Sequence, residues 1–342
     1  MTGIRRRPAV EVLSGDSGDV YFARAEEILA RENLNPMVAL EVFTRANAVL
    51  CGIDEAKVLL AHVLADAPAD DIMVEALSDG DLIEPREVVL RIRARYRLFG
   101  LYETALLGML AQSTGWATAA RGCVEAAAPE PVVSFGARHV HPEITDALDY
   151  AAIVGGCVGA STPAGARVSG LRPTGTMPHS LVLIFGDTVR AAEAFDRHMP
   201  PDVPRIVLVD TFKDEAEEAL RVAHALGDRL YGIRLDTPSE RGRVTPELVQ
   251  EVRARLDQAG FGHVRIIVSG GLDPERIRFF KERAAPVDSY AVGSYISGAH
   301  PLDFTGDIKE IDGQPIAKRG RIPGVTASPR LTRVDLGDWR SG

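Results

Sequence analysis

Short apolar runs alternate with amphipathic helical patterns along the chain from about residue 131 onward. Five of these runs have the length and composition of buried strands: residues 132–135, 206–210, 230–235, 264–269 and 287–292. Between them, apolar residues recur at helical spacing, as in residues 214–226 and 248–256. Alternating strands and helices predict a parallel sheet, here long enough to curl into a barrel or most of one.

Two helix starts in this region share one pattern, a capping side chain followed by proline in the first turn. They are Thr245-Pro246-Glu247 and Asp273-Pro274-Glu275. Residues 141–143 (His-Pro-Glu) have the same order, so we expect a third helix to begin there.

The first 125 residues mix strands and helices without a simple order. We expect helices at 23–31 and 55–64, strands at 37–43, 72–77 and 88–96, and a long helical stretch at 102–128 with one break signal at 113–115. Residues 305–339 have a polar strand-and-turn texture, which we expect to fold back onto the N-terminal half. The predicted domains are an N-terminal α+β domain (1–125, completed by about 300–342) and a β/α-barrel domain (126–299).

Composition limits the class of protein. The 342 residues are 46% hydrophobic and 25% charged, and the net charge of −9 argues against a nucleic-acid partner, which needs a basic surface. The three cysteines, Cys51, Cys123 and Cys157, are too scattered for a disulfide framework, and no CxxC pair is present. No run approaches 18 apolar residues, and no apolar segment follows the arginines at 5–7. We therefore expect a cytoplasmic protein with no membrane partner.

Polar and glycine-rich residues gather at the carboxyl ends of the predicted barrel strands. They are the segments 134–138 (Ser-Phe-Gly-Ala-Arg), 210–213 (Asp-Thr-Phe-Lys), 234–236 (Arg-Leu-Asp), 269–271 (Ser-Gly-Gly) and 293–294 (Gly-Ser). Active sites of parallel β/α barrels lie at this end of the strands, so the succession predicts a catalytic rim.

The glycines after the last two strands suit a phosphate cradle. Gly270, Gly271 and Gly293 let backbone N–H groups approach an anion, and the helix that follows each turn adds its dipole. The alternative is that these glycines only make tight turns.

Arg234 and Asp236 alternate along a strand, so both side chains project to the same side. In an apolar strand such charges are costly unless they are paired or bound to a ligand, and a structural salt bridge is the alternative. Asp210 has the same status, with Lys213 nearby as an anion contact.

His179 is the histidine that we expect to act in chemistry. A lone histidine is more often structural, but this one opens the apolar helical pattern 180–185 beside glycine and threonine donors, where a phosphate fits. Of the other histidines, His139 and His141 lie near the predicted rim.

Six segments, in this order, resemble the nicotinate phosphoribosyltransferase family, particularly its shorter archaeal and bacterial branch. They are residues 18–22, 134–138, 175–180, 234–236, 269–272 and 292–294, and the similarity covers about residues 15–300. The resemblance implies an α/β fold, the irregular β/α barrel of the type II phosphoribosyltransferases with an N-terminal α+β domain. Gly18 and Ser294 stand where the family commonly has threonine, and the cysteine-rich zinc segment of some short members has no counterpart here.

The same resemblance implies a role for each matching residue. The pyridine ring would stack on Phe135, with Tyr21 of a neighbouring subunit on its other face, which implies a homodimer or an assembly of dimers. Arg138 and Arg234 would face the substrate carboxylate or phosphates. Asp236 would face the ribose hydroxyls, and His179 would carry a transient phosphoryl group. The other residues expected in the site are Asp210, Ser161, Thr162, Thr176, Ser269, Gly270, Gly271, Gly293 and Ser294, and the metal ligands stay unassigned.

The implied activity is the formation of nicotinate mononucleotide and pyrophosphate from nicotinate and 5-phosphoribosyl 1-pyrophosphate in NAD biosynthesis. ATP hydrolysis through a phosphohistidine and Mg²⁺ belong to this activity, so the expected partners are small molecules. Residues 156–162 contain no aspartate, which suits a carboxylate better than an amide, and no dense basic cluster is present for two carboxylates. The alternatives are a phosphoribosyltransferase for another pyridine or aromatic acid or amide, such as nicotinamide or quinolinate, and a non-catalytic barrel-fold protein that binds phosphate.

Overall fold

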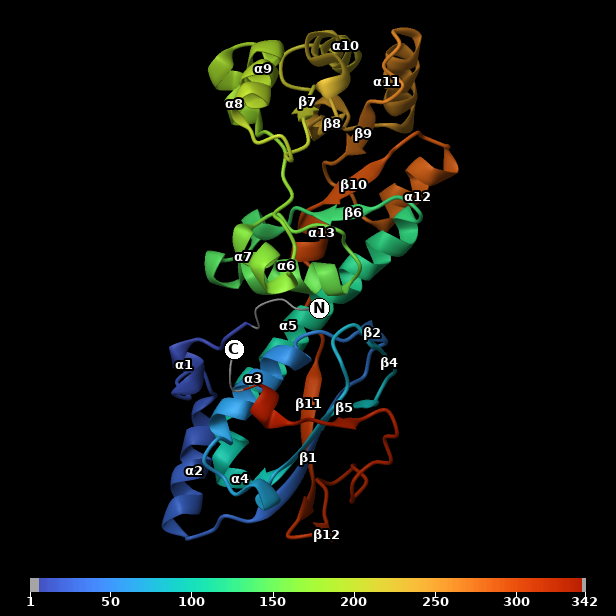
Figure 1. The fold of residues 1–342 in the computed structure, drawn as a ribbon. Helices are drawn as coiled ribbons and strands as arrows, with labels where there is room; N and C mark the ends of the chain where they lie inside the picture. Colours follow the sequence, from blue (N-terminus) through green and yellow to red (C-terminus); the bar gives the residue numbers. More distant parts are fainter. Residues whose placement is uncertain (1–5, 340–342) are drawn as a thin grey trace.

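Two β-sheets, each with its own hydrophobic core, organise the chain into two lobes that meet along one long helix (Figure 1). The computed structural model describes residues 6–339, so residues 1–5 and 340–342, including the arginine at position 5, lie outside the described part of the chain.

The helices are α1 (Val10–Leu13), α2 (Val20–Arg31), α3 (Ile53–Val63), α4 (Tyr96–Phe99), α5 (Glu103–Ala127), α6 (Thr145–Val154), α7 (Pro163–Ser169), α8 (His179–Phe185), α9 (Thr188–His198), α10 (Glu215–Leu226), α11 (Pro246–Gln258), α12 (Pro274–Glu282) and α13 (Ser294–Ser297). The strands are β1 (Met37–Thr44), β2 (Ala48–Val49), β3 (Met73–Ala76), β4 (Leu82–Ile83), β5 (Val88–Arg95), β6 (Val132–Ser134), β7 (Ile206–Leu208), β8 (Gly232–Leu235), β9 (Arg265–Val268), β10 (Ser289–Val292), β11 (Phe304–Ile311), β12 (Gln314–Pro315) and β13 (Thr332–Arg333).

The N-terminal lobe is built on a six-stranded sheet in the order β12-β11-β1-β5-β3-β13. Strand β11 comes from the end of the chain and pairs antiparallel with β1, so that Val42 lies opposite Gly306. The prediction that residues 305–339 return to the N-terminal half is therefore confirmed. Apolar residues of α3 and α5 pack with the apolar face of β1 and β5 and form the core of this lobe.

The second lobe contains a five-stranded parallel sheet in the order β6-β10-β9-β8-β7. Parallel bridges of Val133 with Gly159 and of Ala160 with Pro173 extend the sheet beyond β6. Helices α10, α11 and α12 connect successive strands. Because such crossover helices cover the sheet, its strands are buried and consist largely of consecutive apolar residues. Between residues 6 and 339 no pairing joins the 173 segment to β7, so the wall is open there. The expected α/β fold with a parallel sheet and an N-terminal domain is confirmed.

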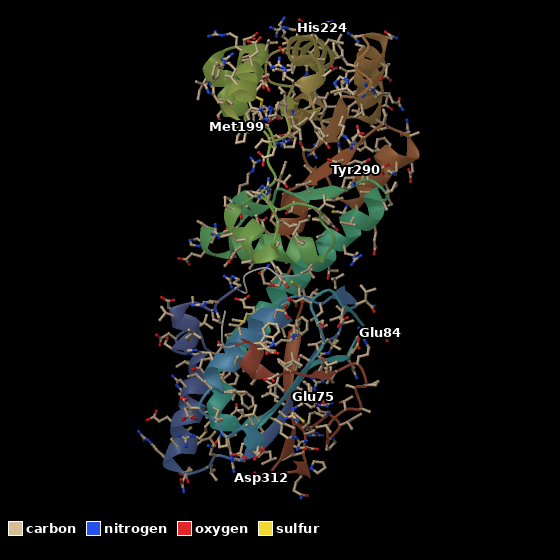
Figure 2. All side chains as sticks on the ribbon, viewed as in Figure 1. Glu75, Glu84, Met199, His224, Tyr290 and Asp312 are labelled. Atoms are coloured by element: carbon tan, nitrogen blue, oxygen red, sulfur yellow. The ribbon has the colours of Figure 1, made fainter. Side chains whose placement is uncertain are left out.

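The core of this lobe lies between the parallel sheet and its helices. Phe280 of α12 and Tyr290 of β10 are both fully buried and meet edge to face, with ring centroids 6.2 Å apart (Figure 2 labels Tyr290). The capping prediction is confirmed at Thr245 and Asp273, whose side chains accept hydrogen bonds from the first turns of α11 and α12. At His141 the chain first makes a short 3-10 turn, and α6 begins at Thr145.

Helix α5 belongs to both lobes, and the break predicted at residues 113–115 is wrong. The hydroxyl of Thr114 is buried and donates to the carbonyl oxygen of Cys51 at 3.0 Å. A Cβ at Gly115 would lie 2.4 Å from the carbonyl oxygen of His300. The small and polar residues that looked like a break signal instead let other segments approach the helix closely. The domain boundary proposed at residue 125 falls inside this continuous helix.

We expect Gly115→Ala to lower the free energy of unfolding by about 1–3 kcal/mol, because its methyl group has no room beside His300. Gly108→Ala is the matched control in the same helix, since nothing lies within 4 Å of the position that its methyl group would take. That variant should raise the free energy of unfolding by about 0.5–1 kcal/mol through helix propensity. Urea unfolding of both variants measures the difference, and equal effects would contradict the close approach.

Candidate active site

A cavity of about 540 Å³ opens at the carboxyl ends of the parallel strands. Its lining comes from the ends of β6 and β8, from the loop before α7 and from the segment that leads into α8. The residues are Phe135, Ala137, Arg138, Ser161, Thr162, Thr174, Gly175, Thr176, Met177, Pro178, His179, Ser180, Leu208, Arg234 and Asp236. Two of the five predicted rim segments, 134–138 and 234–236, therefore meet the 175–180 segment at this cavity.

Arg234 is the centre of the polar network in this cavity. Its guanidinium donates to Asp236 Oδ2 at 2.9 Å, to Ser269 Oγ at 2.8 Å and to Thr176 Oγ1 at 3.3 Å. The same group lies over the ring of Phe135, 5.0 Å from its centroid. Burial lowers the pKa of Arg234, and the carboxylates of Asp236 and Asp210 oppose that shift. The predicted salt bridge exists, and it also forms part of the cavity wall.

Ser269 links the two charges of this pair. Its hydroxyl accepts from Arg234 and donates to Asp236 Oδ1 at 2.9 Å. Ser269 is buried and does not line the cavity, so it holds Asp236 and Arg234 in place rather than contacting a ligand there.

The turn after β9 requires its glycines. Gly270 and Gly271 have φ of +92° and +62°, which favour glycine, and a Cβ at Gly270 would lie 3.1 Å from Asp236 Oδ1. Gly293 comes before α13 with a φ of −112°, and a Cβ there would lie 3.2 Å from His139 Cε1. Ser294 is exposed at the first residue of α13. Gly270 adjoins Asp236, and none of these four residues lines the cavity.

His179 and Asp210 form a pair across the open side of the sheet. His179 is the first residue of α8, and its Nε2 lies 3.0 Å from Asp210 Oδ1. The carboxylate of Asp210 is 1% exposed, and its Oδ2 has no partner among residues 6–339, whereas the imidazole is 39% exposed. The hydrogen bond that His179 donates to Asp210 is the largest cause that raises the pKa of His179 above its ordinary value, and burial acts in the opposite direction.

Asp149 is a residue of the site that sequence reasoning missed. It is fully buried on α6, and its Oδ2 accepts from Thr162 Oγ1 at 2.7 Å and from Thr162 N at 3.1 Å. Thr162 also caps α7 by accepting from Gly165 N. Burial is the main cause that raises the pKa of Asp149. The signal available in the sequence was an acidic residue on the apolar face of a helix. Asp149 fixes the part of the cavity wall that Ser161 and Thr162 form.

Three residues that the sequence singled out lie away from the cavity. Tyr21 is on α2 of the other lobe, 58% exposed, and donates to Asp19 Oδ2 at 3.0 Å, so a single chain does not bring it to Phe135. Lys213 forms an exposed ion pair with Glu217 at 2.7 Å. His139 lies 3.1 Å from the hydroxyl of Ser297, outside the cavity lining.

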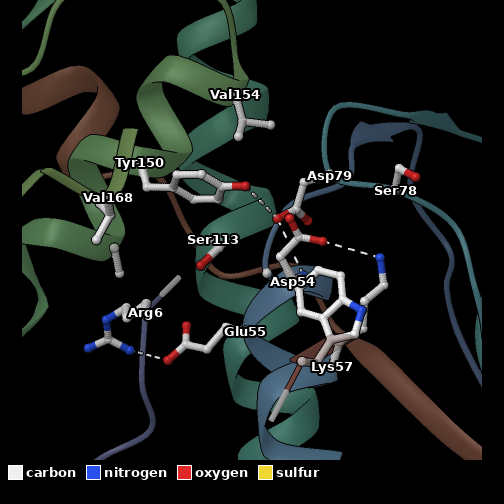
Figure 3. A pocket seen from close by; sticks show the side chains of 13 residues that line it. Arg6, Asp54, Glu55, Lys57, Ser78, Asp79, Ser113, Tyr150, Val154 and Val168 are labelled. Atoms are coloured by element: carbon white, nitrogen blue, oxygen red, sulfur yellow. Dashed lines mark hydrogen bonds and ion pairs between the residues drawn. The ribbon is translucent and has the colours of Figure 1, made fainter. Parts of the chain in front are cut away.

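A second cavity, of about 390 Å³, lies between the two lobes. In Figure 3 the hydroxyl of Tyr150 points at Asp79, to which it donates at 3.1 Å, and Asp54 pairs with Lys57 at 3.2 Å. Burial first, and then the charge of Asp54, raise the pKa of Asp79 to about 7. The charged groups of this second cavity bind one another and lie away from the ends of the parallel strands. The second cavity is therefore part of the contact between the lobes, and the cavity at the strand ends is the candidate active site.

The described residues offer neither a preformed metal site nor a membrane span. No group of three or more histidine, cysteine, aspartate or glutamate side chains is placed to hold a metal ion within residues 6–339. In the same part of the chain, no helix combines the length and apolar character needed to cross a membrane.

The open parallel sheet, the cavity at its strand ends and the preceding α+β lobe define a type II phosphoribosyltransferase. The family model described as "Quinolinate phosphoribosyl transferase, C-terminal domain" matches residues 116–307, and the model of the corresponding N-terminal domain matches residues 19–114. The chain belongs to this family of quinolinate and nicotinate phosphoribosyltransferases. The resemblance expected from the sequence is confirmed at this level.

Relatives of known structure and sequence agree with this assignment. The nicotinate-nucleotide pyrophosphorylase of Pyrococcus furiosus is 43% identical with a TM-score of 0.85, over 95% of this chain and 82% of that one. Human nicotinic acid phosphoribosyltransferase, at 20% identity and a TM-score of 0.72 over 90% of this chain and 77% of that one, shares the fold. The nicotinate phosphoribosyltransferase pncB2 of Mycobacterium tuberculosis is 34% identical over 70% of this chain and 52% of its own length. The chain thus spans about half the length of the curated relatives it matches.

We expect Asp210→Asn to lower the pKa of His179, because the variant removes the negative charge that favours the imidazolium form. In the wild type this pair contributes stability below the ordinary pKa of histidine, and the contribution is lost as the pH rises through the raised pKa. Histidine titration by NMR measures the shift. Glu217→Gln is the control, since the carboxylate of Glu217 pairs with Lys213, and an equal shift in both variants would contradict the assignment.

Proposed function

We propose that the chain catalyses transfer of the phosphoribosyl group from 5-phosphoribosyl 1-pyrophosphate to nicotinate, yielding nicotinate mononucleotide and pyrophosphate for NAD biosynthesis. The observation that carries this proposal is the convergence of Phe135, Arg138, Arg234 and Asp236 in one cavity beside the 270–271 glycine turn. The curated relatives named nicotinate phosphoribosyltransferase support the same choice.

The reaction needs positioning and charge stabilisation more than proton transfer. The lone pair of the pyridine nitrogen forms the bond to C1 of ribose, and the bond from C1 to the pyrophosphate oxygen breaks with its electrons on pyrophosphate. The nitrogen carries no proton to remove, so no general base is required. In this site Phe135 orients the ring by stacking, Asp236 accepts hydrogen bonds from the ribose hydroxyls, and the glycine turn offers N–H donors to phosphate.

The charges in the cavity favour a substrate with one carboxylate. Arg234 is already paired with Asp236, at 2.9 Å. Arg138, which lines the cavity, makes no ion pair among the described residues. One unpaired guanidinium matches one carboxylate, which it can bind with two parallel hydrogen bonds.

Quinolinate is the second candidate substrate, because both family models carry the quinolinate name. Quinolinate brings a second carboxylate, which leaves as CO₂ when the same mononucleotide forms. That carboxylate would require a further cation. Arg138 and Arg234 are the arginines of the cavity lining, and Asp236 already neutralises one of them.

The pair of His179 and Asp210 suits transient phosphorylation by ATP. With its Nε2 proton donated to Asp210, neutral His179 keeps the lone pair of Nδ1 free. In the proposed step, Nδ1 forms a bond to the γ-phosphorus while the bond to ADP breaks, and water later releases phosphate. Mg²⁺ supplies charge stabilisation when bound with the phosphates. Asp210 and Asp236 suit such an ion, which keeps most of its ligands from substrate oxygen and water.

A second subunit would complete the site in this proposal. Tyr21 and Val20 are exposed on α2, and Tyr21 does not reach the cavity of its own chain. A homodimer in which α2 of one protomer approaches Phe135 of its partner would cover the open face of the pyridine ring.

A panel of nicotinate, nicotinamide and quinolinate with 5-phosphoribosyl 1-pyrophosphate, ATP and Mg²⁺ tests the function. Nicotinate should give nicotinate mononucleotide and pyrophosphate, detected by mass spectrometry, at a kcat/KM at least tenfold above the other two. Arg138→Ala should raise KM for nicotinate roughly 10- to 100-fold, because a hydrogen-bonded charge pair is lost. A mixture that turns over only quinolinate would overturn the choice of substrate.

His179→Ala should abolish stimulation by ATP and leave the basal rate, since the histidine takes no part in the transfer itself. ATP stimulation in the wild type should rise with pH through the raised pKa of His179, because the imidazolium has no free lone pair. His224→Ala, on the exposed face of α10, is the control. Loss of all activity together with a lower melting temperature would instead assign a structural role to His179.

A further inference from the structure

Arg243 lies in the loop between β8 and α11 with an unusual backbone. Its φ is +65°, a left-handed conformation that costs a non-glycine residue about 1–2 kcal/mol. The loop is braced at both ends, because Thr237 donates to Glu215 at 2.8 Å and Arg276 donates to the carbonyl oxygen of Val244 at 3.1 Å. Strain of this kind persists where the surroundings hold a residue in place, and it is common at ligand sites.

The guanidinium of Arg243 rests on the glycine turn after β9. A Cβ at Gly271 would lie 2.4 Å from Arg243 Nη1, so the end of the arginine side chain lies directly against this turn. Arg243 is exposed, and its side chain forms no hydrogen bond or ion pair within residues 6–339. The neighbouring Arg241, by contrast, is shared by Asp214 and Glu215.

This unpaired cation stands at the outer end of a row that begins in the cavity. Asp236 lines the cavity, Gly270 adjoins Asp236, and Gly271 adjoins Arg243. A sugar whose hydroxyls bind Asp236 would therefore extend its phosphate group over the 270–271 turn. There the phosphate would meet backbone N–H groups and a guanidinium, whose fork matches two phosphate oxygens.

We propose that Arg243, whose guanidinium lies against the 270–271 turn, binds a phosphate group of the sugar-phosphate substrate. This inference rests on the proposed function for the identity of the substrate. The shared chemistry is a phosphate group, which belongs either to the 5-phosphate of ribose or to the pyrophosphate.

The test measures binding of two anions to the full chain by calorimetry, without any pyridine. Arg243→Ala should weaken the binding of either ribose 5-phosphate or pyrophosphate roughly 10- to 100-fold. The anion whose binding is weakened identifies the phosphate group that Arg243 contacts. Arg243→Lys should restore part of the affinity, because it keeps the charge and loses the fork. The melting temperature should not change. Arg255→Ala, an exposed arginine of α11 paired with Glu251, is the control and should leave both affinities unchanged.

Gly271→Ala gives a second readout, because its methyl group would displace the guanidinium and would also strain the turn at a φ of +62°. In the wild-type background Gly271→Ala should weaken binding of the same anion. In the Arg243→Ala background it should cause a much smaller further loss of affinity. In turnover, Arg243→Ala should raise KM for 5-phosphoribosyl 1-pyrophosphate and leave kcat and the KM for the pyridine unchanged.

Unchanged affinity for both anions in Arg243→Ala would overturn the inference. An equal loss of affinity in Arg255→Ala, or a loss in Arg243→Ala that comes with a lower melting temperature, would overturn it as well. If Arg243→Ala weakens anion binding while the wild-type chain does not turn over nicotinate, the role of Arg243 is supported and the proposed substrate is overturned. The two failures are therefore distinguishable.

Discussion

A charged guanidinium, that of Arg234, is held inside the wall of a parallel sheet, and the rest of the site is arranged around it. A buried charge of this kind is tolerated only when its partners satisfy it, and Asp236, Ser269 and Thr176 do so from three different segments. Because Phe135 packs against the same guanidinium, the aromatic wall and the polar network share one anchor. The positions of Phe135 and Asp236 therefore depend on a single side chain.

The parallel sheet explains why these groups meet. Strands β6 to β10 all end at the same edge, which brings the ends of β6 and β8 into one cavity. The sheet is also curved, so that the segment after the bridge at Pro173 crosses to the opposite edge. There His179 contacts Asp210, which follows β7. Helix α5 serves both lobes, so the scaffold of the rim and the N-terminal sheet are parts of one packed unit.

Much of this architecture was predictable from local pattern. The five parallel strands and the caps at Thr245 and Asp273 follow from periodicity and turn chemistry. The texture of residues 305–339 predicted a return to the N-terminal half, and the structure shows that the partner strand is β1. The break expected in α5 was wrong because serine, threonine and glycine are read locally as helix breakers. Here Thr114 and Gly115 serve contacts with Cys51 and His300, which lie far away in the sequence.

The sequence by itself determined the order of strands and helices and the chemical types at each strand end, because hydrophobic periodicity and capping act over a few residues. Only the tertiary structure decided which of those polar residues touch. It placed Ser269 between Arg234 and Asp236, Asp149 beneath Thr162, and Arg243 on Gly271, while it left Tyr21 in the other lobe. Such contacts depend on sheet curvature and on burial of groups distant in sequence, and no local pattern encodes either of them.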